Sequence, residues 1–516
     1  MSLLDWTGNP FVDSGIAATL VYCKKRKPEE IAQEDLENIN ELLQKIYFTE
    51  AWMSNLYSIF LNHPLNQSSF NLYEVVNKET HERVAGIFSK QKAKKYVESV
   101  PELEIKLAGR ETKKKKQEEH YKFLKGLLDG ITPLADSGDC IACGRRQTRK
   151  RKNRQHIPMT GSGGALNYFS FTAEGADYCD TCAFLVQCSP FTYYACGKLA
   201  LLHSNSAKVM RRWATSAIAD VQRQVASGGF TGCFNEGYTN PQNALFHLAQ
   251  DLIVRAEDDW QDENPSLRLY HFTNYIQGPE LDIYDLPTPV FKFLAEVRRH
   301  PRFRDWRRIV NRGFYFIKKG RQINLSVESK PEGEYKNSKN KIYQDLLAGR
   351  SILYRFINTK LHKAYGDFSL LAVYLTEVLS MDKTRIETVR KVADEIAVFI
   401  RQSQKGERRL RNLEESVKFR DFCNVLRRIS KERIALKAEE PLFTLDEFAE
   451  QLFPEGALTF GETRYLILFR LYEQLHDWLL EQGITSEEAD DGIVEASDDK
   501  PPTSNDDTQL VEGAIQ

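Results

Sequence analysis

The 516-residue sequence has no hydrophobic run long enough to cross a membrane, and its first residues show no basic region before an apolar run, so we expect no signal peptide. Its apolar stretch at 16–23 is far shorter than the roughly 20 residues of a membrane-spanning helix. Five of the nine cysteines show no disulfide-like spacing, which is typical of a reducing compartment. We therefore expect a soluble, cytoplasmic protein without a membrane partner. These five are Cys23, Cys188, Cys196, Cys233 and Cys423.

Catalytic signatures are missing as well. The sequence contains no HExxH, GxSxG or Walker motif, and its ten histidines are scattered without metal-ligand spacing. We therefore predict a non-catalytic protein.

Positive charge is scarce only at the carboxyl end. The formal net charge is −1, but residues 486–516 hold ten acidic side chains and a single lysine. The rest of the chain is therefore basic, as expected of a protein that binds nucleic acid. The tail at 484–516 is predicted to be disordered.

The hydrophobic pattern predicts an α+β protein with a helical carboxyl part. Residues 206–225 show helical periodicity, and residues 267–272 are strand-like. Beyond about residue 340 proline and glycine become scarce and helical periodicity dominates. One stripe of the predicted bundle consists of Val417, Phe422, Val425, Leu426 and Ile429. The predicted parts are a mixed domain at 1–135, a cysteine-bearing insert at 136–195, the remainder of the first domain at 196–335, a helical bundle at 336–483, and the tail.

Two CxxC turns, Cys140–Cys143 and Cys179–Cys182, carry the strongest signal. This spacing lets both sulfurs of a turn face one tetrahedral metal ion, and two such turns complete a four-thiolate zinc site. Because all four positions are cysteine, no ligand position stays open for water, and the predicted Zn²⁺ is structural. The alternative is four unconnected buried or redox cysteines.

A strongly basic run lies between the two turns, and concentrated like charge favours contact with a phosphate backbone. The alternative is a solvated surface loop. The cations of this run are Arg145, Arg146, Arg149, Lys150, Arg151, Lys152 and Arg154.

Four further segments are candidates for nucleic-acid contact. Cations flank the apolar stripe of the helix at 206–225, and a glycine-rich segment at 227–237 could approach a groove, where Asn235 could read a base edge. A basic zone at 298–321 contains aromatics that could stack on bases or equally well lie in the core. The last segment is the outer face of the helix near 427. The candidates are Lys208, Arg211, Arg212, Gly229, Asn235, Arg302, Arg307, Arg308, Arg312, Arg427, Arg428 and Lys431.

The opening residues 6–15 read Trp-Thr-Gly-Asn-Pro-Phe-Val-Asp-Ser-Gly, a tight turn that enters an apolar segment. Together with the two CxxC pairs and a helical carboxyl part, this motif resembles the CXXC-CXXC family of CRISPR-associated proteins. The resemblance implies a large subunit of the type I-B Cascade surveillance complex. Such a subunit would recognise the protospacer-adjacent motif on double-stranded DNA and assist R-loop formation by the crRNA.

The implied partners are crRNA, target DNA with its displaced strand, the other Cascade subunits including small subunits, and a recruited helicase–nuclease. The resemblance also implies that the helical carboxyl part could be made separately, with Met381 as a candidate start. Two other functions stay open. One is a zinc-dependent nucleic-acid enzyme such as a nuclease, and the other is a zinc-ribbon scaffold that binds only protein.

Overall fold

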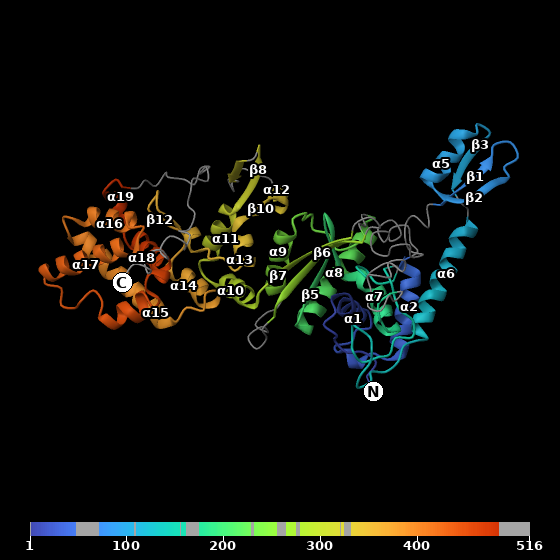
Figure 1. Ribbon diagram of the computed structural model, residues 1–516, viewed down its shortest axis with the longest axis horizontal. Helices are drawn as coiled ribbons and strands as arrows, with labels where there is room; N and C mark the ends of the chain where they lie inside the picture. The colour runs from blue at the N-terminus through green and yellow to red at the C-terminus, as the bar shows by residue number, and fades with distance from the viewer. Residues whose placement is uncertain are drawn as a thin grey trace, which may run out of the picture. The chain divides into compact units, whose positions relative to one another are not determined.

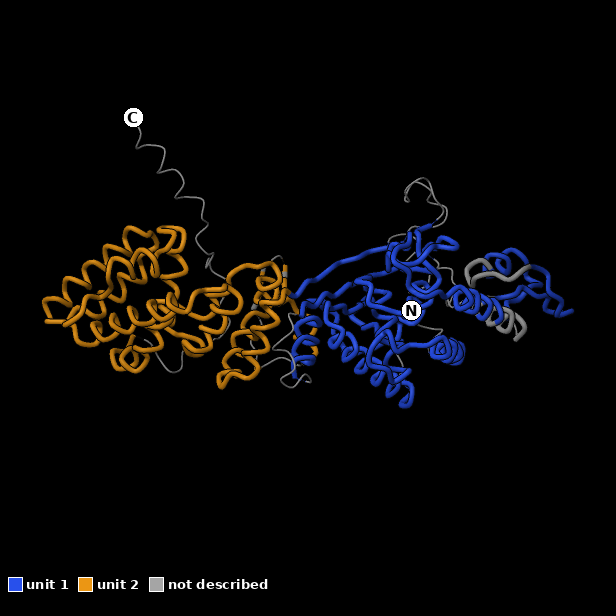
Figure 2. The backbone as a smooth tube through the Cα atoms, turned by 90° about the horizontal axis from the view of Figure 1, so that it is seen from below, with its two compact units in different colours: residues 1–286 blue, residues 287–516 orange. Residues whose placement is uncertain are grey.

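The computed structural model describes residues 2–47, 72–107, 110–154, 156–160, 175–228, 232–254, 265–274, 279–319, 321–324 and 332–484. The chain forms two compact units, Met1–Leu286 and Pro287–Gln516 (Figure 2). The predicted start of the helical bundle at 336 therefore lies inside the second unit. Most of the predicted tail, from residue 485 onward, lies outside the described residues. No helix in the described ranges is long and apolar enough to cross a membrane.

The first unit alternates helices with short antiparallel strands (Figure 1). Its elements in chain order are α1 (Pro10–Tyr22), η1 (Pro28–Glu30), α2 (Gln33–Tyr47), β1 (Leu72–Asn77), β2 (Arg83–Ser89), α5 (Lys90–Ser99), β3 (Leu103–Leu107), α6 (Arg110–Leu128), α7 (Asp180–Cys188), η4 (Ser189–Thr192), β4 (Tyr193–Cys196), β5 (Lys198–Ser204), α8 (Ala207–Ser227), α9 (Pro241–Val254), β6 (Leu267–Thr273) and β7 (Glu280–Leu286).

The described residues of this unit form two antiparallel sheets. The larger one has the strand order β4-β5-β6-β7, and α1, α8 and α9 pack against it. A smaller sheet with the order β2-β1-β3 packs on α5 around a small core of its own. The predicted helix at 206–225 and strand at 267–272 correspond to α8 and β6.

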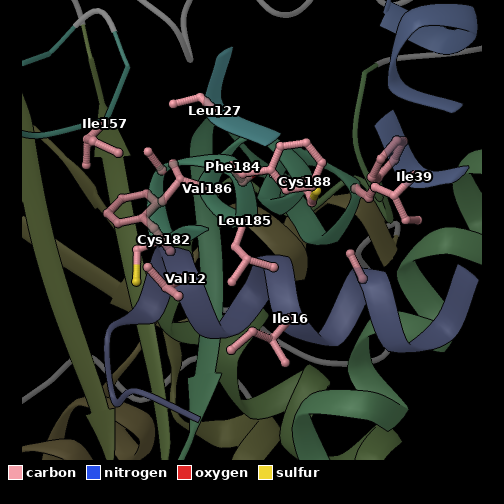
Figure 3. Packing of buried hydrophobic residues seen from close by; sticks show 14 of the residues in the cluster. Val12, Ile16, Ile39, Leu127, Ile157, Cys182, Phe184, Leu185, Val186 and Cys188 are labelled. Carbon is pink, nitrogen blue, oxygen red and sulfur yellow. Dashed lines mark hydrogen bonds between the residues drawn. The ribbon is translucent and has the colours of Figure 1, made fainter. Parts of the chain in front are cut away.

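Helix α1 lies at the centre of the main core. Ten of its thirteen residues are buried, since α7, α8 and β5 surround it. Val12 and Ile16 of α1 face Leu185 of α7 (Figure 3). The same core contains the cysteines of both CxxC turns and residues of the larger sheet. The predicted insert at 136–195 thus shares its hydrophobic core with the amino-terminal helix.

The second unit is largely helical, with short two- and three-stranded sheets. Its elements are α10 (Thr288–Arg299), α11 (Phe303–Arg312), β8 (Phe314–Lys318), β9 (Arg321–Asn324), α12 (Glu332–Asn337), β10 (Lys339–Asn340), α13 (Lys341–Leu347), η5 (Leu353–Arg355), β11 (Ile357–Asn358), β12 (Lys363–Ala364), α14 (Phe368–Glu377), α15 (Lys383–Gln402), α16 (Gly406–Glu415), α17 (Phe419–Ala435), the π-helical turn η6 (Glu447–Leu452), η7 (Gly456–Thr459), α18 (Phe460–Gln474) and α19 (His476–Glu481).

The core of the second unit joins segments on both sides of Met381. The Phe469 ring of α18 lies 6.4 Å from the Phe356 ring and 6.3 Å from the Phe368 ring, measured between centroids. Asp367 caps α14 by accepting a hydrogen bond from the Leu370 amide. Together the two units confirm the predicted α+β class with a helical carboxyl part.

Candidate metal centre and nucleic-acid interface

The four CxxC cysteines converge on one point. The sulfurs of Cys140, Cys143, Cys179 and Cys182 all lie within 4.8 Å of one another. Sulfurs bound to one tetrahedral zinc at about 2.3 Å are separated by about 3.8 Å, and Cys143 Sγ lies 4.0 Å from Cys179 Sγ. Three of the four side chains are buried. This cluster can hold a metal ion such as zinc.

Each turn is shaped by its own backbone. In the first turn the Gly144 amide donates to the Cys140 carbonyl at 2.7 Å, and Gly144 has a φ of 62°. That conformation suits glycine, because a side chain is strained there. In the second turn Cys179 is the N-cap of α7, and its sulfur accepts from the Cys182 amide at 3.4 Å. The two turns are linked, since the Cys179 amide donates to Cys140 Sγ at 3.3 Å.

The thiols perturb one another because four sulfurs share a small, partly buried volume. A hydrogen bond with Cys140 lowers the pKa of the Cys143 thiol. Hydrogen bonds with Cys140 and Cys143 raise the pKa of the Cys182 thiol well above its ordinary value. Four thiolates at this distance repel one another unless a cation lies between them, so the donor set fits a divalent metal ion.

The opening motif is attached to this cluster. Asn9 is the N-cap of α1, and its Oδ1 accepts from the Phe11 and Val12 amides. Its Nδ2 also donates to the hydroxyl of Tyr178, the residue before Cys179, at 3.0 Å. One side chain therefore fixes the start of α1 and the entry to the second cysteine turn.

Two more residues of the motif hold its geometry. The buried carboxylate of Asp13 accepts from the amides of Thr7 and Gly8, and it lies 3.0 Å from His203 Nε2 on β5. Gly15 lets α1 and α7 approach closely, since a Cβ at this position would lie only 1.8 Å from the Leu185 carbonyl oxygen. The motif thus fixes both α7 and β5.

Arg146 also binds the cluster, although the sequence predicted a phosphate contact for it. Its guanidinium is buried and donates to the carbonyls of Thr132 and Leu3 and, at 3.8 Å, to Cys143 Sγ. Four thiolates around a divalent ion would carry a net charge of about −2, which this cation would offset. The chain before α1 is fastened to the first turn by the same side chain.

One comparison with known proteins finds a family model that matches the segment containing both cysteine turns. Residues 134–194 match the model of a family described as CRISPR-associated protein (Cas_CXXC_CXXC). The chain carries a CRISPR-associated CXXC-CXXC domain. Neither a curated protein nor a solved structure matches the chain.

Within the CXXC-CXXC domain, the basic run divides into interior and exterior cations. Besides Arg146, Lys152 and Arg154 are buried. Lys152 Nζ lies 2.7 Å from Asp180 Oδ1, and Arg154 Nε donates to Asn274 Oδ1 at 3.0 Å. A phosphate could reach these three only if the surrounding packing opened, so the structure gives them an internal bonding role. Their predicted contact with nucleic acid stays untested.

The exterior cations of the run are Arg145, Arg149, Arg151 and Lys150. The first three form ion pairs with Asp5, Asp180 and Asp177, respectively. Lys150 is exposed, and no carboxylate in the described part of the chain pairs with it. Exposed ion pairs such as those of Arg145 and Arg151 are weak, and the Arg149 side chain is exposed although its partner Asp180 is buried. These four cations therefore remain candidates for phosphate contact.

The candidates outside the domain occupy different settings. Lys208 is exposed, whereas Arg211 and Arg212 are half-buried on α8. Asn235 is exposed, and it follows Phe234, whose backbone forms hydrogen bonds with β4. The loop that carries Asn235 therefore lies along the edge of the larger sheet. Asn235 Oδ1 accepts from the Gly237 amide at 2.9 Å. Gly229 lies outside the described residues.

In the second unit, Trp306, Phe314 and Tyr315 are buried, so they belong to the core and cannot stack on bases. Arg302 pairs with Asp367 and Asp305, Arg308 pairs with Asp305, and the Arg312 guanidinium covers the Tyr365 ring at 3.3 Å. Arg307 is exposed on α11. On α17, Arg427, Arg428 and Lys431 are also exposed. For these four cations, the described residues contribute no ion-pair partner.

Proposed function

We propose that this chain is the large, non-catalytic subunit of a type I-B Cascade complex. It recognises the protospacer-adjacent motif on double-stranded DNA, assists R-loop formation by the crRNA, and recruits the helicase–nuclease. The observation that carries the proposal is the hydrogen bond from Asn9 to Tyr178. It joins the opening motif and the cysteine turns, the two most specific parts of the family resemblance, in one folded element.

The proposed metal is a structural Zn²⁺ held by the four cysteines. In the part of the chain that the structure describes, they are the one group of three or more His, Cys, Asp or Glu side chains with metal-ligand geometry. Four protein ligands leave no open position for a zinc-bound water, which supports an architectural role. The alternative nuclease predicts metal-dependent cleavage of DNA by the purified chain, and that result would overturn the proposal.

Motif recognition is tested with a crRNA-loaded complex assembled with and without this chain. Gel shifts would compare duplexes that differ only in the flanking motif. We expect the complete complex to discriminate between them and Asn235→Ala to weaken discrimination about tenfold, the scale of one good base contact. Gln222→Ala, which removes an exposed amide from α8, is the matched control. Equal discrimination by complexes with and without the chain would refute motif recognition by this subunit.

Phosphate contacts are tested by the salt dependence of binding. Each lost contact should lower the slope of log affinity against log salt by about 0.7–0.9. We expect this change for Lys150→Ala and for Arg427→Ala, because both side chains are exposed. Lys152→Ala should instead lower stability, since it leaves the buried Asp180 without its nearest cation. A protein-binding scaffold would show no salt-dependent affinity for DNA.

A further inference from the structure

The second unit contains a cavity of about 850 Å³. It lies between α13 and η5 on one side, the turn before α15 on another, and the start of α18. Sites for small ligands typically measure about 300–1,000 Å³. This cavity is therefore large enough for an aromatic ring with a polar substituent, and it contains none of the nucleic-acid-binding candidates.

The carboxylates of the cavity already have partners. Asp345 accepts from Arg350 at 2.8 Å and from the Tyr354 hydroxyl at 2.8 Å. Asp382 caps α15 through the Thr384 amide. The remaining carboxylate, Glu462, pairs with Arg385 at 3.5 Å. Asp345 and Glu462 therefore present no unpaired negative charge to a ligand, and Asp382 is engaged at the start of α15.

Arg355 differs from the other cations that line the cavity, because Lys341, Arg350 and Arg385 all form ion pairs. No carboxylate of the described chain pairs with it, and its Nε is buried without a hydrogen-bond partner among those residues. Its guanidinium lies over the Tyr354 ring, 4.6 Å from the centroid. The nearby side chains of Leu353 and Met381 are buried and apolar. Arg355 thus combines a flat cationic surface with apolar walls.

We propose that this cavity binds a nucleotide. The base would stack on the Tyr354–Arg355 pair, because both the phenol ring and the planar guanidinium group can stack on the face of a base. The phosphate would lie toward Arg350 and Lys341, which both pair with Asp345 and keep further donors. The proposal concerns the chain alone and does not require motif recognition.

The test uses purified full-length chain and 2-aminopurine, whose fluorescence falls when it stacks. One arm contains the 2-aminopurine mononucleotide, a second contains it within a ten-nucleotide single strand, and a third contains the same labelled strand with abasic sites at all other positions. Quenching in the first arm identifies a free nucleotide as a ligand. Quenching only in the strands identifies an unpaired base of a nucleic acid. Absence of quenching in all three arms would overturn the proposal.

Variants separate the cavity from the general basic surface. Arg355→Ala should weaken binding about tenfold, the scale of losing one stacking contact. Arg355→Lys keeps the charge but removes the planar surface, and it should also lose quenching. Arg390→Ala removes an exposed arginine of α15 outside this cavity and should bind within about twofold of the native chain. Thermal unfolding checks that both Arg355 variants remain folded. Native quenching in folded Arg355→Lys and Arg355→Ala would assign the ligand to another site.

Discussion

Gly15→Ala should disrupt the contact between α1 and α7, the helix that carries two residues of the four-cysteine cluster at its start. The added Cβ would lie 1.8 Å from the Leu185 carbonyl oxygen, whereas real Cβ contacts are essentially never under 3.0 Å. The obstacle is backbone, so α1 and α7 must separate by more than 1 Å over a packed interface. Overpacking of this kind costs about 1–3 kcal/mol, and we expect the upper end. For a unit of this size the melting temperature should fall by about 6–12 °C.

The same displacement should loosen the metal site, because Cys179 and Cys182 lie at the start of α7. We expect faster transfer of bound zinc to a chromophoric chelator, measured next to the melting temperature. The matched control is Gly126→Ala on α6, where an added Cβ meets no atom within 4 Å. It should be neutral or stabilise the helix by up to about 1 kcal/mol. If Gly15→Ala melts and releases zinc like the native chain, the close approach is not required.

Three further predictions follow from the same structure. Asn9→Ala removes a helix cap and the bond to Tyr178, and it should destabilise the first unit by about 2 kcal/mol in thermal unfolding, whereas Tyr178→Phe should cost less because the cap remains. Burial and two neighbouring lysines lower the pKa of His156 to about 4 from 6.5. The folded chain should therefore lose about 3 kcal/mol as the pH falls from 6.5 to 4, and His156→Phe should show a smaller fall than the native chain. A fragment at 381–516 lacks Phe356 and Phe368, which pack on Phe469 of α18, and it should bind a hydrophobic dye, unlike a fragment at 287–516; a compact, dye-free short fragment would contradict this.

The sequence predicted the parts of the fold that depend on local spacing. The CxxC turns, the helix at 206–225 and the helical carboxyl part each follow from a repeat within a few residues. Val417 shows the limit of such patterns. The pattern places it on one helical stripe with Phe422 and Val425, but it is 69% exposed because α17 begins two residues later, at Phe419.

Partners distant in sequence could not be predicted from spacing. Lys152 looks like a surface cation until Asp180, 28 residues later, is placed beside it. The cap formed by Asn9 is visible locally, because asparagine before proline is a typical helix start. Its bond to Tyr178 spans 169 residues and has no local signal. The same limit applies to Trp306, whose burial is fixed by tertiary packing.

The central position of α1 also has a consequence for synthesis. This helix leaves the ribosome before the elements that cover it, because α7, β5 and α8 lie at 180–227. At about 5–20 residues per second, the nascent chain carries an uncovered apolar helix for roughly 10–40 s. Tyr178, which accepts the hydrogen bond from Asn9, and the second cysteine turn at 179–182 emerge in the same late interval. The four-cysteine cluster therefore cannot form before Cys182 has emerged, and α1 stays without its covering elements throughout that interval.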